Sequence, residues 1–281
     1  MERFVSGPKR NYYGKGDVII YRLHRDGTAP PGVSPVFGAK VLMLTYGDAF
    51  WPTYTTGDNT GLVATDSMKN FIQRKTLEFA GDDLARYCRF LGASFLDCYP
   101  HAEGVQVSAA RIPFAGDAGG VAFTPAGPDR AMARVELVGS DLVEATQGLH
   151  GLKLLRLNGS AFHGFVRDEF TTLPEITNRP LHMWLDVEWR FTNPADAFEG
   201  PTTDCVRTLV AEAFTSFESG SIQQLIHTMA TRLLHALPAV GEVRLEANNR
   251  TWDTVVEQGD AVGIYTDARP AYGCLGVTLT R

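Results

Sequence analysis

The sequence has few cysteines, no long apolar run and no excess of positive charge. Its 281 residues include four cysteines without a CxxC spacing, as expected of free thiols in a reducing compartment. No stretch approaches the roughly 18 consecutive apolar residues that a membrane helix requires. The 26 lysines and arginines against 32 acidic residues give a net charge of −6, whereas nucleic-acid-binding proteins usually carry a basic surface. From these absences we expect that neither a membrane nor a nucleic acid is a partner of this protein.

Several common catalytic motifs are missing. The sequence contains no GxGxxG, GxxxxGK(S/T), HExxH or GxSxG, and its seven histidines show no metal-ligand spacing. This argues against nucleotide cofactors, catalytic zinc and a serine nucleophile. The first residues hold no apolar run of signal-peptide length, and the last carry no retention signal, so we expect a cytoplasmic protein. An enzyme with this sequence is expected to work with side chains alone, without metal or cofactor.

The sequence does contain a regular order of strand and helix patterns. Apolar alternation predicts strands, and apolar residues three and four positions apart predict helices. In the first half we expect strands 17–25 and 40–47, helices 66–81 and 82–93, and strands 105–113 and 130–138. In the second half we expect strands 152–158 and 181–191, helices 205–219 and 221–237, and strands 243–247 and 274–280.

This repeated order predicts an α+β fold of two tandem ββααββ units, residues 1–145 and 146–281. Each unit is expected to form a curved antiparallel sheet with its helices on one face, because amphipathic helices must bury their apolar stripe. The first long helix is expected to open at Thr65-Asp66, a pair suited to an N-cap.

Three segments together resemble the urate oxidase (uricase) family. They are Tyr13-Gly14-Lys15, the stretch TGDNTGLVATDSMKN at 56–70, and FHGFVRDEFTTL at 162–173, which leads to Arg179. Weaker similarity continues through 221–224 and the closing ARPAYGCLGVTLTR, whereas about 91–129 matches poorly. The resemblance implies the tunnelling fold, whose repeat is ββααββ and which assembles into an oligomeric barrel.

The resemblance also implies a reaction. Members of the family oxidise urate with O₂, without metal or organic cofactor, and give 5-hydroxyisourate and hydrogen peroxide. Ground-state dioxygen reacts slowly with closed-shell organic molecules, so the substrate must become an electron-rich anion by losing a proton. The protein must therefore hold a flat polar ring, take protons from it, and place O₂ or water above it.

Five residues are expected to hold the substrate and O₂. Arg179 and Gln223 suit the polar edge of the ring, because a guanidinium offers a planar fork of donors and an amide both donates and accepts. Ile222 is implied to contribute its backbone amide, and Phe162 to stack under the ring. Asn249 is implied to contact the O₂ or water site.

Three further residues are implied to handle protons or to order the site. Lys15 and Thr65 form a proton relay, and Asp66 orients the helix start and adds its backbone amide. In the family the lysine and threonine come from different subunits, which implies a homo-oligomer, typically a tetramer. Without the resemblance, ordinary structural roles would be favoured: a surface lysine for Lys15, a helix cap for Thr65 and a core phenylalanine for Phe162.

One expected site residue departs from the family. The family has Asn-Lys-His where this sequence has Asn249-Arg250-Thr251. The histidine completes the relay, and its imidazole titrates near neutral pH. Thr251 can hydrogen-bond but cannot take up a proton there, although it occupies the catalytic position.

Smaller departures lie beside the arginine and in the first strand. Asn178 and Pro180 stand where the family has an aspartate and an aliphatic residue, and Val18-Ile19-Ile20 omits a common arginine. A divergent member is therefore expected, acting on urate or on a different heterocycle. Two alternatives remain open: a zinc-dependent purine or pterin hydrolase of the same fold, and a catalytically impaired paralogue that acts as a binding protein.

Overall fold

The chain forms two compact units. The computed structural model describes residues 9–25, 27, 29–116, 122–259, 262–268 and 270–281. The first unit contains the described residues up to 147 together with 190–200, and the second contains 148–189 and 201–281. Two long strands, β7 (Asp141–Phe162) and β8 (Ile176–Phe191), contribute residues to both units.

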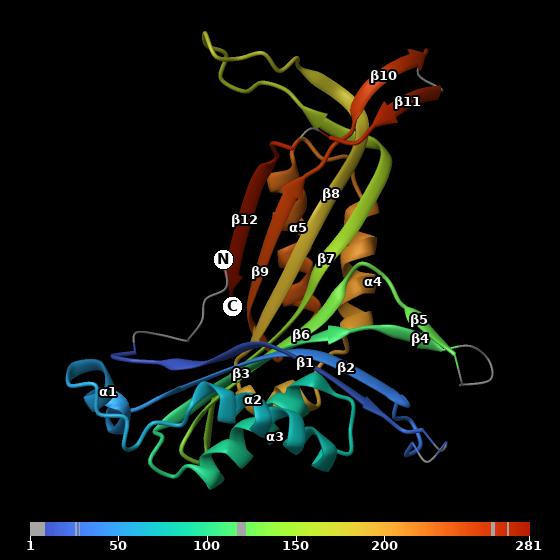
Figure 1. Cartoon of the computed structure of the whole chain (residues 1–281). Coiled ribbons are helices and arrows are strands. Elements are labelled where there is room, and N and C mark those ends of the chain that lie inside the picture. Colours follow the sequence, from blue (N-terminus) through green and yellow to red (C-terminus); the bar gives the residue numbers. More distant parts are fainter. Residues whose placement is uncertain (1–8, 26, 28, 117–121, 260–261, 269) are drawn as a thin grey trace. The chain divides into compact units, whose positions relative to one another are not determined.

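The first unit is an antiparallel sheet with helices on one face (Figure 1). Its strands lie in the order β1-β2-β3-β6, with β7 beside β6. Its elements are β1 (Tyr13–Leu23), β2 (Val36–Tyr46), the 3-10 turn η1 (Asp48–Phe50), α1 (Trp51–Thr55), α2 (Thr65–Lys75), the turn η2 (Thr76–Glu78), α3 (Leu84–Cys98), β3 (Gly104–Ile112), β4 (Phe114–Gly116), β5 (Phe123–Pro125) and β6 (Arg130–Val138). The 3-10 turn η3 (Pro194–Phe198) also belongs to this unit.

The second unit repeats this plan. Its sheet strands lie in the order β7-β8-β9-β12, and helices α4 and α5 cover one face (Figure 1). Its remaining elements are α4 (Thr203–Thr215), α5 (Ile222–Ala236), β9 (Val240–Asn249), β10 (Asp253–Gln258), β11 (Val262–Thr266) and β12 (Gly273–Thr280).

The expected ββααββ order is confirmed in both units, with additions that the sequence patterns did not predict. Each unit carries a two-stranded ribbon between its last two sheet strands, β4–β5 in the first and β10–β11 in the second. Strands β4 and β5 are three residues each, too short for apolar alternation to show. Strand β7 runs over 22 residues and is much longer than the expected strand 152–158. Its first half was not predicted because buried and exposed residues alternate weakly there.

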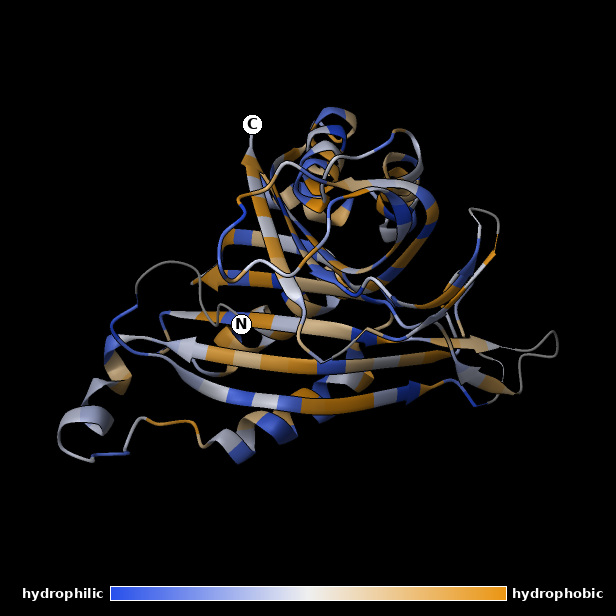
Figure 2. Cartoon of the chain, turned by 90° about the horizontal axis from the view of Figure 1, so that it is seen from above, coloured by the Kyte–Doolittle hydropathy of each residue, from blue (hydrophilic) through white to orange (hydrophobic). Residues whose placement is uncertain are grey.

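Apolar faces of helix and sheet build the core of each unit. In the first, α3 places Tyr87, Leu91 and Phe95, all fully buried, against β3 and β6. In the second, α5 packs Leu225 and Met229 against β9, β12 and α4. Burial of each such side chain stabilises the fold by about 1.5–3 kcal/mol. Figure 2 shows the matching alternation of apolar and polar positions along the sheet strands.

The expected N-cap at Thr65-Asp66 is wrong. Helix α2 has Ala64 as its N-cap residue, and no side chain caps it. Thr65 and Asp66 are instead its first two helical residues, so the threonine hydroxyl is not used for capping. By contrast Asp83 caps α3, where its carboxylate accepts the backbone N–H of Arg86 over 2.7 Å.

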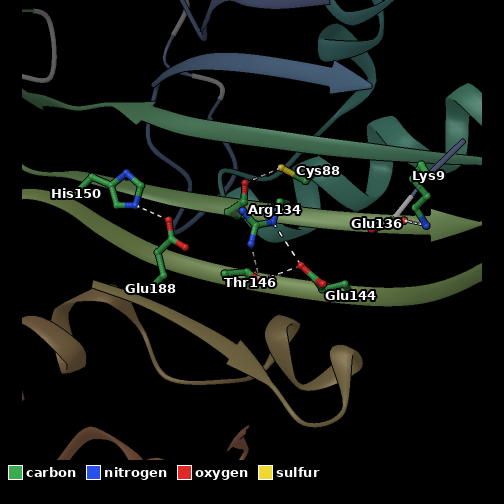
Figure 3. A network of polar contacts seen from close by, with 9 residues as sticks. Lys9, Cys88, Arg134, Glu136, Glu144, Thr146, His150 and Glu188 are labelled. Carbon is green, nitrogen blue, oxygen red and sulfur yellow. Dashed lines mark hydrogen bonds and ion pairs between the residues drawn. The ribbon is translucent and has the colours of Figure 1, made fainter. Parts of the chain in front are cut away.

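A buried carboxylate ties the segment before β1 to the sheet (Figure 3). Glu136 of β6 is 1 % exposed and accepts the hydroxyl of Tyr46 over 2.6 Å. The ammonium of Lys9 lies 2.9 Å from the same carboxylate and 4.4 Å from the centre of the Tyr46 ring. Burial, reinforced by the carboxylate of Glu136, raises the pKa of Tyr46. These contacts fix the chain that leads into Tyr13-Gly14-Lys15.

The four cysteines are unpaired, as expected, and only Cys88 among them is buried. In the part of the chain that the structure describes, no helix is both long and apolar enough to cross a membrane.

Candidate active site

The expected site residues fall into two groups, one in each unit. Lys15, Thr65 and Asp66 belong to the first unit. The second unit contains Phe162, Arg179, Ile222, Gln223, Asn249 and Thr251.

Close strand contact explains the glycine before Lys15. A Cβ at Gly14 would lie 1.9 Å from the carbonyl oxygen of Met43 on β2, so no other residue fits there. Lys15 pairs with Met43 and is half-buried, and the β1–β2 register shifts immediately after it. The irregularity sets Lys15 apart from the regular ladder that follows.

Tyr13 ties the strand that carries Lys15 to the loop that leads into Thr65, the first residue of α2. Its phenol oxygen accepts the backbone N–H of Val63 over 3.1 Å, and its ring packs edge-on against Phe50 with centroids 5.0 Å apart. Burial raises the pKa of Tyr13 to about 12, so the phenol stays neutral across the physiological range. The sequence patterns did not reveal this role, because the contact joins residues 50 positions apart.

Thr65 and Asp66 differ in what they contact. The Thr65 side chain is exposed and makes no hydrogen bond with any described residue. The Asp66 carboxylate accepts from Lys69 over 2.5 Å and from Asn70 over 3.2 Å. These bonds, above all that from Lys69, hold the pKa of Asp66 below its usual range, and the charge of Lys15 adds a smaller effect in the same direction. Asp66 therefore stays ionised in the first turn of α2, while the hydroxyl of Thr65 remains available.

Arg179 carries a positive charge that no described residue neutralises. Its Nε is buried without a hydrogen-bond partner, and no ion pair joins its guanidinium to the described residues. Loss of hydration lowers its pKa, yet arginine stays charged in proteins. Because a partly desolvated charge without an acceptor is costly, this half-buried position is suited to an anionic ligand that would supply the missing acceptor.

A network of hydrogen bonds joins the end of β7 to the start of α5. Buried Arg156 donates to the carbonyls of Phe214 and Phe217 over 2.9 and 2.8 Å, and to that of Gly159 over 2.5 Å. It also reaches the hydroxyl of Ser219 over 2.6 Å. The backbone N–H of Ala161 donates to the carbonyl of Ser219 over 2.8 Å. Phe162, the next residue, is thereby held close to the first turn of α5.

Asn178 joins this network from β8. Its side-chain oxygen accepts the backbone N–H of Gly159 over 2.7 Å. Arg179 follows directly, so the arginine backbone is fixed to the end of β7 from which Phe162 projects. The asparagine that departs from the family pattern therefore has a clear structural role in this chain.

The first turn of α5 leaves two amides open. Ser221 caps the helix by accepting the backbone N–H of Gln224 over 3.1 Å, and the Gln224 side chain accepts that of Gly220 over 2.8 Å. The backbone N–H groups of Ile222 and Gln223 have no partner in the helix. The Gln223 side chain is exposed and bonds to no described residue, whereas the Ile222 side chain is only 5 % exposed.

Thr251 is bonded to Asn249. Its hydroxyl donates to the Asn249 side-chain oxygen over 2.6 Å, and its backbone N–H donates to the same oxygen over 3.1 Å. Both bonds orient the carboxamide, and they leave the Asn249 amino group open. The hydroxyl proton of Thr251 is thus already used in a hydrogen bond to Asn249.

The site residues of the second unit share one end and one face of the sheet. Strand alternation puts Phe162, Arg179 and Asn249 on the same face as the buried residues Ser160, Leu181 and Ala247. This is the face that α5 covers, at the end where α5 begins. His182 contacts the carbonyl of Arg250 over 3.3 Å, but it alternates with buried Leu181 and so faces the other side.

The described residues contain no group of three or more histidines, cysteines or acidic side chains that could hold a metal ion. An unneutralised arginine, open backbone amides and an aromatic ring lie at one end of the sheet, an arrangement suited to a flat, anionic, polar ligand. The fold is that of the solved urate oxidases, the tunnelling fold.

Comparisons with known proteins agree. A sequence profile of the uricase family matches residues 145–270. A uricase from Haloferax volcanii is 36 % identical, over 89 % of this chain and 91 % of that protein. The crystal structure of urate oxidase from Bacillus sp. TB-90 has a TM-score of 0.86 and 34 % identity, and covers 96 % of this chain and 100 % of that one. The chain belongs to the uricase family.

Another relative is longer than this chain. The uric acid degradation bifunctional protein of Bacillus sp. strain TB-90 is 34 % identical over 96 % of this chain, which spans only 60 % of that protein.

Proposed function

We propose that the protein oxidises urate, or a closely similar purine, with O₂ and without a cofactor. The reaction would convert urate, O₂ and water to 5-hydroxyisourate and hydrogen peroxide. The half-buried guanidinium of Arg179, whose buried Nε has no partner, carries the proposal, since urate supplies both the negative charge and the planar acceptors that it lacks. Family membership is the second support.

The second unit would bind the ring. Arg179 would donate two parallel hydrogen bonds to one polar edge, and the Gln223 amide would pair with a neighbouring edge. The open N–H of Ile222 would donate to a ring oxygen or nitrogen. Phe162 would stack against the ring, which adds about 0.5–1.5 kcal/mol beyond the area buried and keeps the heterocycle flat. The free amino group of Asn249 would contact O₂ or water.

The first unit would handle protons. Lys15 would accept a proton that the free hydroxyl of Thr65 passes on, which leaves the substrate as the electron-rich anion that O₂ oxidises. Ionised Asp66 would stabilise the charged lysine and the start of α2. Two electrons and two protons then reduce O₂ to hydrogen peroxide, and water adds to the oxidised ring.

We propose that the active form is a homo-oligomer, expected to be a tetramer, in which Lys15 and Thr65 of one site come from different copies. Two surface features support this assembly. Strands β1 and β12 each have a sheet neighbour on one side only, which leaves backbone groups open to another strand. The β10–β11 ribbon exposes Val255, Val256, Val262 and Ile264, and β1 exposes Ile19, Tyr21 and Leu23. The free cysteines are consistent with a cytoplasmic enzyme.

Two measurements test the proposal. Purified protein mixed aerobically with urate should remove the urate absorbance and release peroxide, with other purines and pteridines as comparisons. Size-exclusion chromatography with light scattering should give the mass of a tetramer. An inactive protein would refute the proposed reaction, and an active monomer would refute the shared site.

A further inference from the structure

The loop after β7 folds a second aromatic ring onto Phe162. The rings of Phe162 and Phe165 are stacked, with centroids 4.9 Å apart and planes only 14° from parallel. Gly164 makes this fold-back possible because its φ of +73° is rarely adopted by other residues. Its N–H donates to the Glu175 carboxylate over 3.2 Å, which closes the loop onto the chain that enters β8.

A nearby charge and local hydrogen bonds order the chain that follows Phe165. The guanidinium of Arg167 lies 5.7 Å from the centre of the Phe165 ring, within the range of a cation–π contact. The turn that follows is closed by the Asp168 carboxylate, which accepts the backbone N–H of Phe170 over 3.0 Å and the hydroxyl of Thr171 over 2.9 Å. The Asp168 N–H in turn donates to the hydroxyl of Thr171 over 2.9 Å.

We propose that Phe165 is a positioning residue that sets the plane on which the substrate ring stacks. The inference rests on the proposed function, in which Phe162 is the platform for the heterocycle. No aromatic ring other than Phe165 stacks on Phe162 among the described residues. A ring held on one face by a parallel neighbour is restrained against rotation, and its other face meets a flat ligand without first being ordered.

In the proposed arrangement Phe165 stacks on one face of Phe162 and the substrate on the other, with the Arg167 guanidinium near the Phe165 ring. Phe165 touches no substrate atom and acts only through the orientation of Phe162. Its loss should therefore weaken binding of the planar substrate more than it slows the chemical step, because the reacting atoms and the proton-handling residues are unchanged.

A double-mutant cycle on the full chain tests this. The variants are Phe165→Leu, Phe162→Leu and the pair together, and the readout is equilibrium binding of urate without oxygen. Phe165→Leu should weaken binding roughly 2- to 10-fold, raise KM by a similar factor and change kcat less. In the Phe162→Leu background it should have no further effect, since the ring it orients is gone.

Two controls separate positioning from general damage. Phe165→Tyr keeps the stacked ring and should restore binding to within about twofold of the wild type. Phe170→Leu removes a phenylalanine that is 82 % exposed in the same loop and should leave binding unchanged. Wild-type protein that binds no purine would overturn the proposed function and the inference with it. Wild-type binding with either unaffected Phe165→Leu binding or equal losses in both backgrounds would overturn the inference alone.

Discussion

Thr251 holds the side-chain oxygen of Asn249 by two hydrogen bonds, from its hydroxyl over 2.6 Å and from its backbone N–H over 3.1 Å. A carboxamide held at its oxygen directs its amino group away from the threonine. The residue that stands where the family has a relay histidine therefore acts on its neighbour, and its hydroxyl proton is not free to move along a relay.

This relationship predicts the effect of changing Thr251. Thr251→Val keeps the shape and the backbone bond but removes the hydroxyl, so the turnover rate should fall roughly 2- to 12-fold, the value of one hydrogen bond. Thr251→Ser should retain most activity. The pH–rate profile of both variants should match the wild type, because no titrating group is lost. A displaced pH profile in Thr251→Val would show that the hydroxyl takes part in proton transfer after all.

Arg179 should be required for binding but not for stability. Arg179→Met removes the guanidinium and should weaken urate binding by about 2–5 kcal/mol. The melting temperature should stay the same or rise, because the unliganded protein loses a half-buried charge whose Nε has no partner. Arg179→Lys keeps the charge but not the planar fork and should also bind poorly. Thermal unfolding with and without urate measures both effects, and a large fall in stability of Arg179→Met would mean that the arginine is structural.

Tyr13→Phe should loosen the contact between β1, which carries Lys15, and the loop that leads into α2 of the same chain, and so disturb the position of both proton-handling residues. It leaves the Val63 N–H without an acceptor and should cost about 0.5–1.5 kcal/mol of stability and part of the turnover rate. The folded-state pKa of Tyr13 is raised to about 12, so the stability from its neutral phenol is complete below pH 10 and is lost between pH 10 and 12. Denaturation across this range should show a shallower alkaline loss in Tyr13→Phe. If stability falls equally between pH 10 and 12 in the wild type and in Tyr13→Phe, the Tyr13 phenol does not have a raised pKa in the folded protein.

Arg156 should be a structural arginine. Arg156→Ala removes the donor that bonds to three carbonyls and a hydroxyl, and the free energy of unfolding should fall by about 2–4 kcal/mol. Arg232→Ala, at an exposed position on α5, is the matched control and should change stability by less than about 0.5 kcal/mol. Chemical denaturation compares the two, and equal effects would contradict the role given to the network.

The strand and helix order was predictable, because amphipathic patterns are local and each unit is built from them. The apolar spacing at Ile222, Leu225 and Met229, for example, marks α5 in the sequence and forms its buried face in the structure. The positions of Phe162, Arg179 and Asn249 at one sheet end also follow once the strands are placed, since the antiparallel order brings those ends together.

The features that the sequence patterns did not predict are set by tertiary contacts. The hydrogen bond between Val63 and Tyr13 and the stacking of Phe165 on Phe162 both depend on the path of the folded backbone. In the sequence, Tyr13 and Phe165 cannot be told from other aromatic residues. Helix α2 opens at Thr65 as expected, but no side chain caps it, so the capping role that the local preference of Thr and Asp predicts is absent.

The most direct test of the proposed activity follows urate, oxygen and peroxide together in one aerobic reaction. Wild-type protein, dialysed against a chelator, should consume urate and O₂ and release hydrogen peroxide in equal amounts, and Arg179→Met should do none of these. Oxidation that disappears on dialysis and returns with an added metal, or urate binding without O₂ consumption, would contradict the account.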